Sequence, residues 1–401
     1  MIRKKIRIIA PTLIALVWVG LSPSLWAEIR LPAVIGDHMV IQQDKPVSIW
    51  GWAEPGEEVS IRLSGQEMKA RAGGDGRWRV IFPALKAGGG PLEILVRGTR
   101  GPEVAVRDIQ VGEVWVCSGQ SNMEWPLSMT ASPTPEILRA DHPDIRLFLV
   151  PKCTSDRPQD DFKAVWTPCS PETAAPFSAV AYYFGLELHQ KLRIPVGLIE
   201  AAWGGTAIEP WIPPAGLMSV PETKAIWDEL GLKVEAYRSD LEKVLPAWEA
   251  QTSVLRLPHT GMAIITDITD LNDIHPRNKK DVGARLALWA RARTYGETEL
   301  VPSGPLYKSM SIEEDRVRIS FDYIGGGLIA NDGQPLRWFE VAGDDHIFYK
   351  AEAAIDGETV VVSSQKVTAP KAVRFGWHQT AVPNLANRQG LPASPFRTDR
   401  W

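Results

Sequence analysis

Three short segments of the chain carry residue types that hydrolases combine at their active sites. The first is Gly119–Met123 (GQSNM), in which Ser121 directly follows an apolar run that predicts a strand. At the carboxyl end of a parallel strand, the following turn exposes a serine hydroxyl, and nearby backbone N–H groups can stabilise an oxyanion. Because position 123 is Met, the segment is not the Gly-x-Ser-x-Gly elbow of the α/β-hydrolases. A serine after a strand is more often a helix N-cap, so Ser121 alone does not identify a nucleophile.

The second segment, Asp270–Asn278 (DLNDIHPRN), contains a histidine among acidic residues. A serine hydroxyl is a weak nucleophile until a base takes its proton, and histidine is the usual base at neutral pH. His275 in turn needs a partner that fixes its tautomer, and Asp273 and Asp270 are both close in sequence. The alternative interpretation is a surface loop in which an Asp caps the following helix.

The third segment, Trp203–Trp211 (WGGTAIEPW), follows another apolar run. Paired glycines at a strand end present backbone amides that suit an oxyanion hole, although a plain glycine-rich turn has the same pattern. We therefore take Gly204 and Gly205 as candidate oxyanion or substrate-binding residues, with Gln120 and Asn122 beside the serine. Since each of the three segments follows a predicted strand, a parallel sheet would bring them together at one edge.

The elements around these segments predict a parallel α/β domain over residues 108–299. Apolar runs predict strands at 111–117, 145–150, 196–201 and 262–265. Helical spacing predicts helices at 177–192, 221–250 and 281–295. Strands that alternate with helices are typical of a parallel sheet, here with four core strands.

Both flanks of this domain are rich in short alternating runs. Residues 28–107 contain such runs at 47–52 and 59–63, separated by glycine-rich turns, which predicts a β-sandwich-like N-terminal domain. Residues 300–401 contain similar runs at 317–321 and 359–363 and predict a β-rich C-terminal region. The predicted fold class is therefore α/β with β-sandwich regions at both ends.

The motifs resemble those of a known family. Val114–Pro126 (VWVCSGQSNMEWP) is long and specific, and it resembles the nucleophile block of the sialate O-acetylesterase family, part of the SGNH (GDSL-like) hydrolases. Trp203–Trp211 is similar to the family's second block, and Asp273–Pro276 (DIHP) to its His block. Gly36–Gln43 and Pro370–Trp377 also resemble members, so the likeness extends over most of the chain.

This resemblance implies an SGNH-type three-layer sheet and an enzyme that removes O-acetyl groups from sialic acid or other acetylated carbohydrates. It implies a serine mechanism without cofactor: Ser121 attacks the acetyl carbonyl, His275 moves the proton, and the backbone N–H groups of Ser121 and Gly205 hold the oxyanion. The sequence has no Cys-x-x-Cys motif and no zinc-ligand spacing, so we expect no metal.

The identity of the acid is left open by the resemblance. The wider hydrolase group places its Asp three residues before the His, and here that position is Asn272. Asp273 is therefore the first choice for the residue that orients His275, and Asp270 is the second. A Ser–His dyad assisted by a backbone carbonyl is the third alternative.

One block of the family is missing from the chain. Members carry a motif like Trp-Tyr-Gln-Gly-Glu-Ser-Asn between the second block and the His block, and its Asn or Gln resembles a third oxyanion donor. The segment between 212 and 262 is too short and too polar to contain it. Either the sheet closes around the gap and keeps a weakened site, or the domain packs poorly. The rival function is thus a non-catalytic or impaired carbohydrate-binding relative.

The N-terminus predicts export. Four basic residues within the first seven precede an apolar run at 8–20, and Ala27 suits the last position of a signal peptide at 1–27. We expect a periplasmic or secreted protein, with an uncleaved anchor as the alternative because Leu25 is larger than usual. Removal of the signal changes the formal net charge from −4 to 40 − 48 = −8, which argues against nucleic acid as a partner. No other segment is apolar enough to span a bilayer, so the mature form has no predicted membrane contact.

The three cysteines fit this compartment in two ways. Export permits a disulfide, and Cys153 and Cys169 are the natural pair by their separation, although unpaired thiols are equally consistent with the sequence. Cys117 lies four residues before Ser121 on a predicted buried strand, so we interpret it as a core residue.

Overall fold

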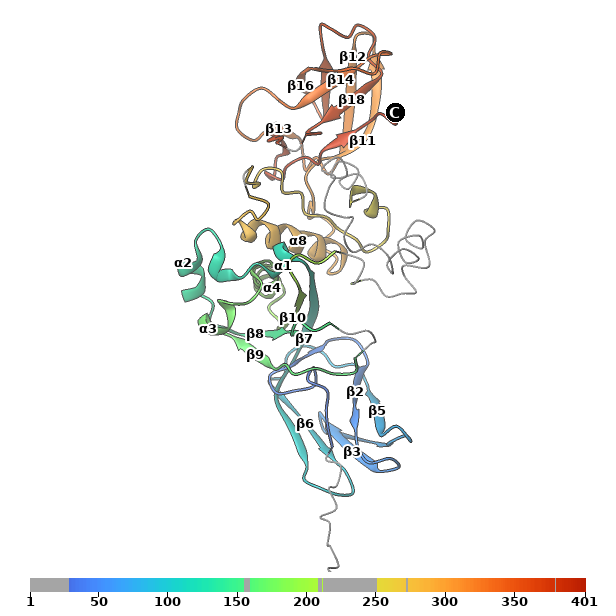
Figure 1. Cartoon of the computed structure of the whole chain (residues 1–401), viewed down its shortest axis with the longest axis vertical. Helices are drawn as coiled ribbons and strands as arrows, with labels where there is room; N and C mark the ends of the chain where they lie inside the picture. The colour runs from blue at the N-terminus through green and yellow to red at the C-terminus, as the bar shows by residue number, and fades with distance from the viewer. Residues whose placement is uncertain (1–28, 155–158, 208–210, 212–250, 272, 379) are drawn as a thin grey trace, which may run out of the picture.

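The computed structural model describes residues 29–154, 159–207, 211, 251–271, 273–378 and 380–401. The predicted signal peptide at 1–27 lies outside these residues, as does the predicted helix at 221–250. The described chain is a mixed α/β protein with several sheets, and its N-terminal, central and C-terminal parts follow one another along the long axis (Figure 1). Within the described part, no helix is long and apolar enough to cross a membrane.

The N-terminal part consists of two antiparallel sheets around one hydrophobic core. Its strands are β1 (Val40–Gln42), β2 (Val47–Trp52), β3 (Glu58–Leu63), β4 (Gln66–Arg71), β5 (Arg77–Phe82) and β6 (Leu92–Arg97). β2 pairs with β5, and β4, β3 and β6 are the N-terminal strands of an eight-stranded sheet that continues into the central part. Alternate residues of both sheets, including Ile49, Ile61 and Val80, are buried in a shared core. The strands predicted at 47–52 and 59–63 are confirmed.

One long strand, β7 (Val104–Gly119), joins the N-terminal sheets to the central part. Its first residues pair antiparallel with β6, and residues 113–119 pair parallel with β10 (Val196–Ala202). Between these stretches, residues 110–112 pair with β1. Asp108 lies within the strand at φ +54, and its carboxylate accepts two hydrogen bonds from the buried Arg146 of β8 (His142–Leu149). The sequence boundary between 107 and 108 therefore falls inside a continuous strand.

The central part places one helix against the parallel strands and a second helix on the first. The strand order is β7, β10, β8 and β9 (Trp166–Cys169), of which the first three are parallel. The helices are α4 (Ala179–Leu192) and α8 (Lys279–Arg293), within two residues of the predicted bounds, and they pack on each other. Gly185 allows the close contact of α4 with β10, since a Cβ there would lie 2.5 Å from Leu198 Cδ1. Three short helices lie beside these strands in the chain. α1 (Ser121–Glu124) follows β7, α2 (Pro133–Leu138) precedes β8, and α3 (Pro171–Ala174) follows β9.

The strand predicted at 262–265 is wrong, because this segment is not a strand. Its carbonyl groups bind side chains of α8 instead of a neighbouring strand: Trp289 Nε1 donates to Met262 at 2.9 Å, and Arg285 Nη1 donates to Ile264 at 2.6 Å. The fourth parallel strand is β1, which comes from the N-terminal part.

The other edge of β7, at the end next to Ser121, faces no neighbouring strand in the part of the chain that the structure describes. No strand among the described residues pairs with this edge between 113 and 119, and Val116 is 65% exposed there. A cavity of about 260 Å³ lies beside it, lined mainly by apolar side chains that include Trp115, Phe184 and Trp289.

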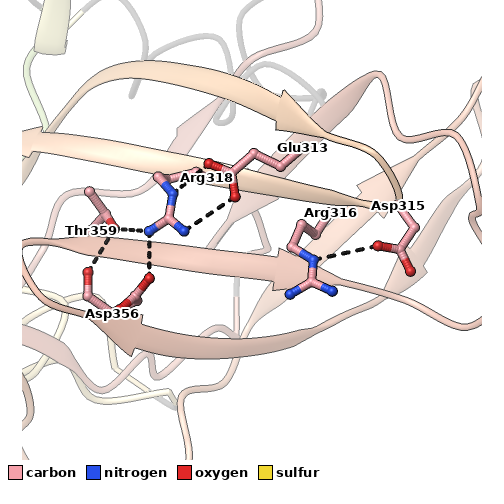
Figure 2. A network of polar contacts seen from close by, with 6 residues as sticks. All are labelled: Glu313, Asp315, Arg316, Arg318, Asp356 and Thr359. Carbon is pink, nitrogen blue, oxygen red and sulfur yellow. Dashed lines mark hydrogen bonds and ion pairs between the residues drawn. The ribbon is translucent and has the colours of Figure 1, made fainter.

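The C-terminal part is entirely β in the described residues. Its strands are β11 (Leu306–Glu313), β12 (Arg316–Asp322), β13 (Leu328–Ala330), β14 (Phe339–Ala342), β15 (Phe348–Lys350), β16 (Glu352–Asp356), β17 (Thr359–Ser363), β18 (Ala372–Phe375), β19 (Leu385–Asn387) and β20 (Phe396–Arg397). The first sheet has the order β11-β12-β17-β16. Figure 2 shows that the guanidinium of Arg318 connects all four of its strands, through Glu313, Asp356 and Thr359. The strands predicted at 317–321 and 359–363 are confirmed.

All three cysteines are free thiols, so the suggested Cys153–Cys169 disulfide does not form. Cys169 is buried at the end of β9 and directs its Sγ to the Ala140 carbonyl, whereas Cys153 lies exposed on the chain after β8. Cys117 is a core residue as predicted, and burial raises the pKa of its thiol to about 12.

Candidate active site

Ser121 is the first residue of α1 and lies just beyond the carboxyl end of β7. Gly119 ends the strand at φ +155, and a Cβ there would be 3.0 Å from Met123 Cβ, so the turn leaves little space for a side chain. The backbone N–H groups of Met123 and Glu124 both donate to the Gln120 carbonyl, which closes the turn around the serine. Gln120 itself is exposed. The sequence thus places Ser121 at the strand end through one glycine and a single helical turn.

His275 lies next to Ser121 although the two residues are 154 positions apart in sequence. Its Nε2 is 2.9 Å from Ser121 Oγ, which is hydrogen-bond distance. The ring is stacked on Trp125, with the ring centres 5.2 Å apart and an angle of 19° between the planes. This stacking restricts the rotation of the imidazole and keeps Nε2 directed at the serine.

Asp273 faces the other nitrogen of the ring. Its Oδ1 is 3.4 Å from His275 Nδ1 and also accepts a 2.8 Å hydrogen bond from the His275 backbone N–H. The Asp273 side chain is 43% exposed. Asp270 contributes its backbone carbonyl, which accepts from the Asp273 N–H at 3.4 Å. The first-choice acid therefore lies beside the imidazole, at a distance longer than that of a strong charged hydrogen bond.

A second contact holds the histidine loop against the serine. Asn122 Nδ2 donates to the Ile274 carbonyl at 3.2 Å, and Lys279 Nζ donates to Asn122 Oδ1 at 2.5 Å. Asn122 was a candidate for oxyanion or substrate binding, but both ends of its amide bind protein groups. Lys279, at the start of α8, is only 2% exposed, and burial lowers the pKa of its ammonium to about 8.

The glycine-rich loop after β10 packs directly on the serine. A Cβ on Gly204 would lie 3.3 Å from Ser121 Cβ and 3.0 Å from Glu124 Oε2. The Gly204 N–H donates to the Glu124 carboxylate, which also pairs with Lys152. Burial alone would raise the pKa of Glu124, but the hydrogen bonds from Lys152 and from the Gly204 N–H outweigh it and lower the pKa. Of the two predicted donors, Gly204 thus has its amide engaged by Glu124, and Gly205, at φ +77, is exposed with open space at its Cα.

A buried carboxyl group contributes to a hydrogen-bond network that reaches the turn around Ser121. Glu200 of β10 is 2% exposed, and its Oε2 accepts a 2.8 Å hydrogen bond from the Ser178 N–H at the start of α4. Ser178 Oγ in turn donates to the Met123 carbonyl at 2.5 Å. Burial is the main cause that raises the pKa of Glu200 to about 7.

The structure therefore brings together Ser121, His275, Asp273 and Gly204, with Gly205 as the next residue of the same loop. Sequence reasoning missed the polar residues that hold them: Glu124, Lys152, Ser178, Glu200 and Lys279. A signal existed for Glu200, because a carboxyl group within the apolar run 196–201 must be buried with a partner. Lys279 gave no such signal, since lysine in the first turn of a helix is ordinarily exposed. The described residues contain no group of three or more His, Cys, Asp and Glu that could hold a metal ion.

Comparisons with known proteins connect this geometry with a family. The chain is 25% identical to the human sialate O-acetylesterase over 499 residues, which cover 93% of this chain and 94% of the human one. It is 29% identical to the rat sialate O-acetylesterase over 514 residues, covering 92% of this chain and 94% of the rat one. Both alignments are longer than the 401 residues of this chain, so these relatives contain segments that it lacks.

A solved structure shares the fold as well as the sequence. A carbohydrate acetylesterase from Xanthomonas citri matches with a TM-score of 0.85 and 35% identity, covering 93% of this chain and 100% of that chain. The chain matches no protein-family model. Since sequence and structure are shared over nearly the whole length, the chain belongs to the sialate O-acetylesterase family of carboxylic ester hydrolases.

Proposed function

We propose that the protein is a serine esterase that removes O-acetyl groups from carbohydrates, with Ser121 as its nucleophile. The observation that carries the proposal is the 2.9 Å contact between Ser121 Oγ and His275 Nε2. The human and rat relatives are named sialate O-acetylesterases and the Xanthomonas citri relative a carbohydrate acetylesterase. These names support sialic acid or another acetylated carbohydrate as the substrate.

In the first half of the reaction, Ser121 Oγ attacks the acetyl carbonyl carbon and its proton passes to His275 Nε2. The tetrahedral intermediate then breaks its bond to the sugar oxygen, which takes the proton from Nε2. Water attacks the acetyl-serine with the same proton transfers, and acetate leaves. Asp273 near Nδ1 favours the tautomer with the proton on Nδ1, so that the Nε2 lone pair is free to accept the serine proton.

The negative charge of the intermediate needs donors near Ser121. We assign this role to the backbone N–H groups of Ser121 and Gly205, because the Gly204 N–H already donates to Glu124. The family's third donor is missing from the sequence, and loss of one oxyanion donor costs about 10²–10³-fold in rate. The proposed enzyme is therefore slower than one with three donors.

The wider organisation is part of the same proposal. We infer an SGNH-type three-layer esterase domain at 108–299, flanked by β-rich domains at 28–107 and 300–401. The parallel order of β7, β10 and β8, with α4 packed on the sheet and α8 packed on α4, supports this layout. Export to the periplasm or outside the cell rests on the sequence of residues 1–27 alone.

Two measurements on purified protein test the proposal. A fluorophosphonate probe should label Ser121, and the label should be absent from the Ser121→Ala and His275→Ala variants. Acetate release from acetylated sialic acid or acetylated xylan should likewise be lost in Ser121→Ala. Binding of these sugars by a protein that neither reacts with the probe nor releases acetate would instead support the rival function, a non-catalytic carbohydrate-binding relative.

A further inference from the structure

Lys279 is a buried cation next to the proposed catalytic pair. The residue is 2% exposed, and its Nζ lies 5.4 Å from the centre of the Trp125 ring, which is stacked on His275. Burying an ammonium group is costly unless the charge has partners, so a lysine in this position requires a reason. Its hydrogen-bond acceptor is Asn122 Oδ1 at 2.5 Å.

The chemistry of the ammonium fixes the direction of the Asn122 amide. A charged lysine has three donors and no acceptor, so it can bind only the oxygen end of an amide. The nitrogen end then points away from Lys279, and Asn122 Nδ2 donates to the Ile274 carbonyl at 3.2 Å. A reversed amide would place two donors against each other at Lys279 and two acceptors against each other at Ile274.

This chain of contacts connects the two halves of the site. Asn122 is the neighbour of Ser121 in α1, and Ile274 is the neighbour of His275 in the loop before α8. Two further contacts join the His275 loop to the turn around Ser121: the Ser121–His275 hydrogen bond and the stacking of His275 on Trp125. The Asn122 amide is therefore one of the contacts that set the distance from Ser121 Oγ to His275 Nε2, beside the Trp125 stacking and a backbone hydrogen bond from Ala131 to Arg277.

We propose that Lys279 is a positioning residue of the esterase site, whose ammonium orients the Asn122 amide and so holds the His275 loop against the helix of Ser121. The inference rests on the proposed function, because it assigns Lys279 a role in the geometry of the Ser121–His275 pair. Lys279 does not touch the reacting atoms in this role.

Protonation makes the role measurable. Burial lowers the pKa of Lys279 to about 8, although the negative charge of Asp273 acts in the opposite direction and raises it. A neutral amine donates a weaker hydrogen bond than an ammonium and can also accept, so above this pH one of the two contacts that orient the Asn122 amide weakens and only the Ile274 carbonyl still fixes its direction. The wild-type kcat should therefore fall on the alkaline side with a midpoint near pH 8.

The experiment compares Lys279→Met, Asn122→Ala and the double variant with the wild type, using acetate release and the rate of fluorophosphonate labelling. Lys280→Met is the matched control, because Lys280 is the next residue of α8, is exposed and pairs with Glu136. We expect Lys279→Met to lower kcat and the labelling rate by about 10- to 10²-fold, as misplacing a catalytic group by up to 1 Å does, with little change in KM. Lys280→Met should match the wild type.

The double variant tests whether Lys279 acts through Asn122. We expect it to be no slower than Asn122→Ala, since residues that act through one another are not additive. Thermal unfolding controls for folding: Lys279→Met removes a buried charge but leaves Asn122 Oδ1 without its donor, so we expect a small change in Tm beside a large loss of activity. If Lys279→Met lowers the Tm markedly, Lys279→Gln, which keeps a neutral donor, takes its place in the same cycle.

The outcomes separate the two proposals. A wild-type protein without labelling or acetate release overturns the proposed function itself. If the wild type is labelled and active, three results would overturn only the role of Lys279. These are wild-type rates in Lys279→Met, additive effects in the double variant, and an alkaline fall in kcat that Lys279→Met leaves in place.

Discussion

The contact between Asp273 and His275 allows a quantitative prediction for Asp273→Asn. The substitution removes the negative charge but keeps an oxygen that accepts the 2.8 Å hydrogen bond from the His275 backbone N–H. The loop geometry should therefore survive, and the change in rate should report the charge alone.

The magnitude follows from the distance and the exposure. An imidazolium and a carboxylate 3.4 Å apart attract each other by about 1.2 kcal/mol in bulk water and by ~4.9 kcal/mol at an effective dielectric constant of about 20. Because the Asp273 side chain is 43% exposed, the value lies towards the lower limit. At about 1.4 kcal/mol per tenfold, kcat/KM should fall by about 10-fold and by no more than about 10²-fold. A buried, tightly bonded acid in a triad is worth about 10⁴-fold.

The assay is acetate release from an acetylated sugar, with Asp270→Asn as the parallel variant. A loss of about 10⁴-fold or more for Asp273→Asn would refute the argument from exposure, because it would require a tight, desolvated contact. An unchanged rate would remove Asp273 from the mechanism. The acid is then Asp270 if Asp270→Asn is impaired, and a Ser–His dyad operates if neither variant is.

Three further predictions follow from the packing and the buried groups. Gly204→Ala should lower kcat by up to about 10²-fold, because its Cβ would press on Ser121 and Glu124. The Cβ of Gly205→Ala meets no atom within 4 Å, so this variant should cost only about 1–2 kcal/mol of stability for its φ of +77. Equal loss of activity in the two variants would contradict this prediction. Burial raises the pKa of Glu200 to about 7, above its value of about 4.3 in an unfolded chain, so the native state keeps a proton that the unfolded state has lost, and stability should fall between these pH values. Urea unfolding at pH 5 and pH 7 should show this slope in the wild type and a flatter one in Glu200→Gln, and identical slopes would show that Glu200 does not titrate in this range. Because the three cysteines are free, dithiothreitol should leave the Tm unchanged and the unfolded protein should give three reactive thiols; a Tm lowered by reduction would reveal a disulfide.

Contiguous patterns allowed much of the fold and the central residues of the site to be predicted. The strand that ends before Ser121, the strand at 196–202 and both helices have alternating or helical apolar spacing that is visible in a single window. His275 was identifiable because an acid stands two residues before it. In each case the information lies within about fifteen residues of sequence.

What could not be predicted depends on contacts between distant segments. Residues 262–265 have the composition of a strand, yet their carbonyls are bound by Arg285 and Trp289 of α8, about twenty residues later. The fourth parallel strand, β1, lies in the N-terminal part and pairs with the middle of β7. The sequence allowed the Asn122 amide to be a substrate-binding group. In the fold, Lys279 binds its oxygen and the Ile274 carbonyl binds its nitrogen.

The open edge of β7 shows how a chain without the family's internal block can still assemble its site. Among the described residues this edge has no strand partner from 113 to 119. The serine and the glycine-rich loop are nevertheless held by the other edge, where β7 and β10 pair up to Gly119 and Ala202. The histidine loop is held by α8, which packs on α4, and α4 in turn contacts β10 through Gly185. Neither half of the Ser121–His275 contact is attached to this edge in the described part of the chain. In the proposed mechanism, we therefore expect the missing block to affect oxyanion stabilisation more directly than the alignment of Ser121 with His275.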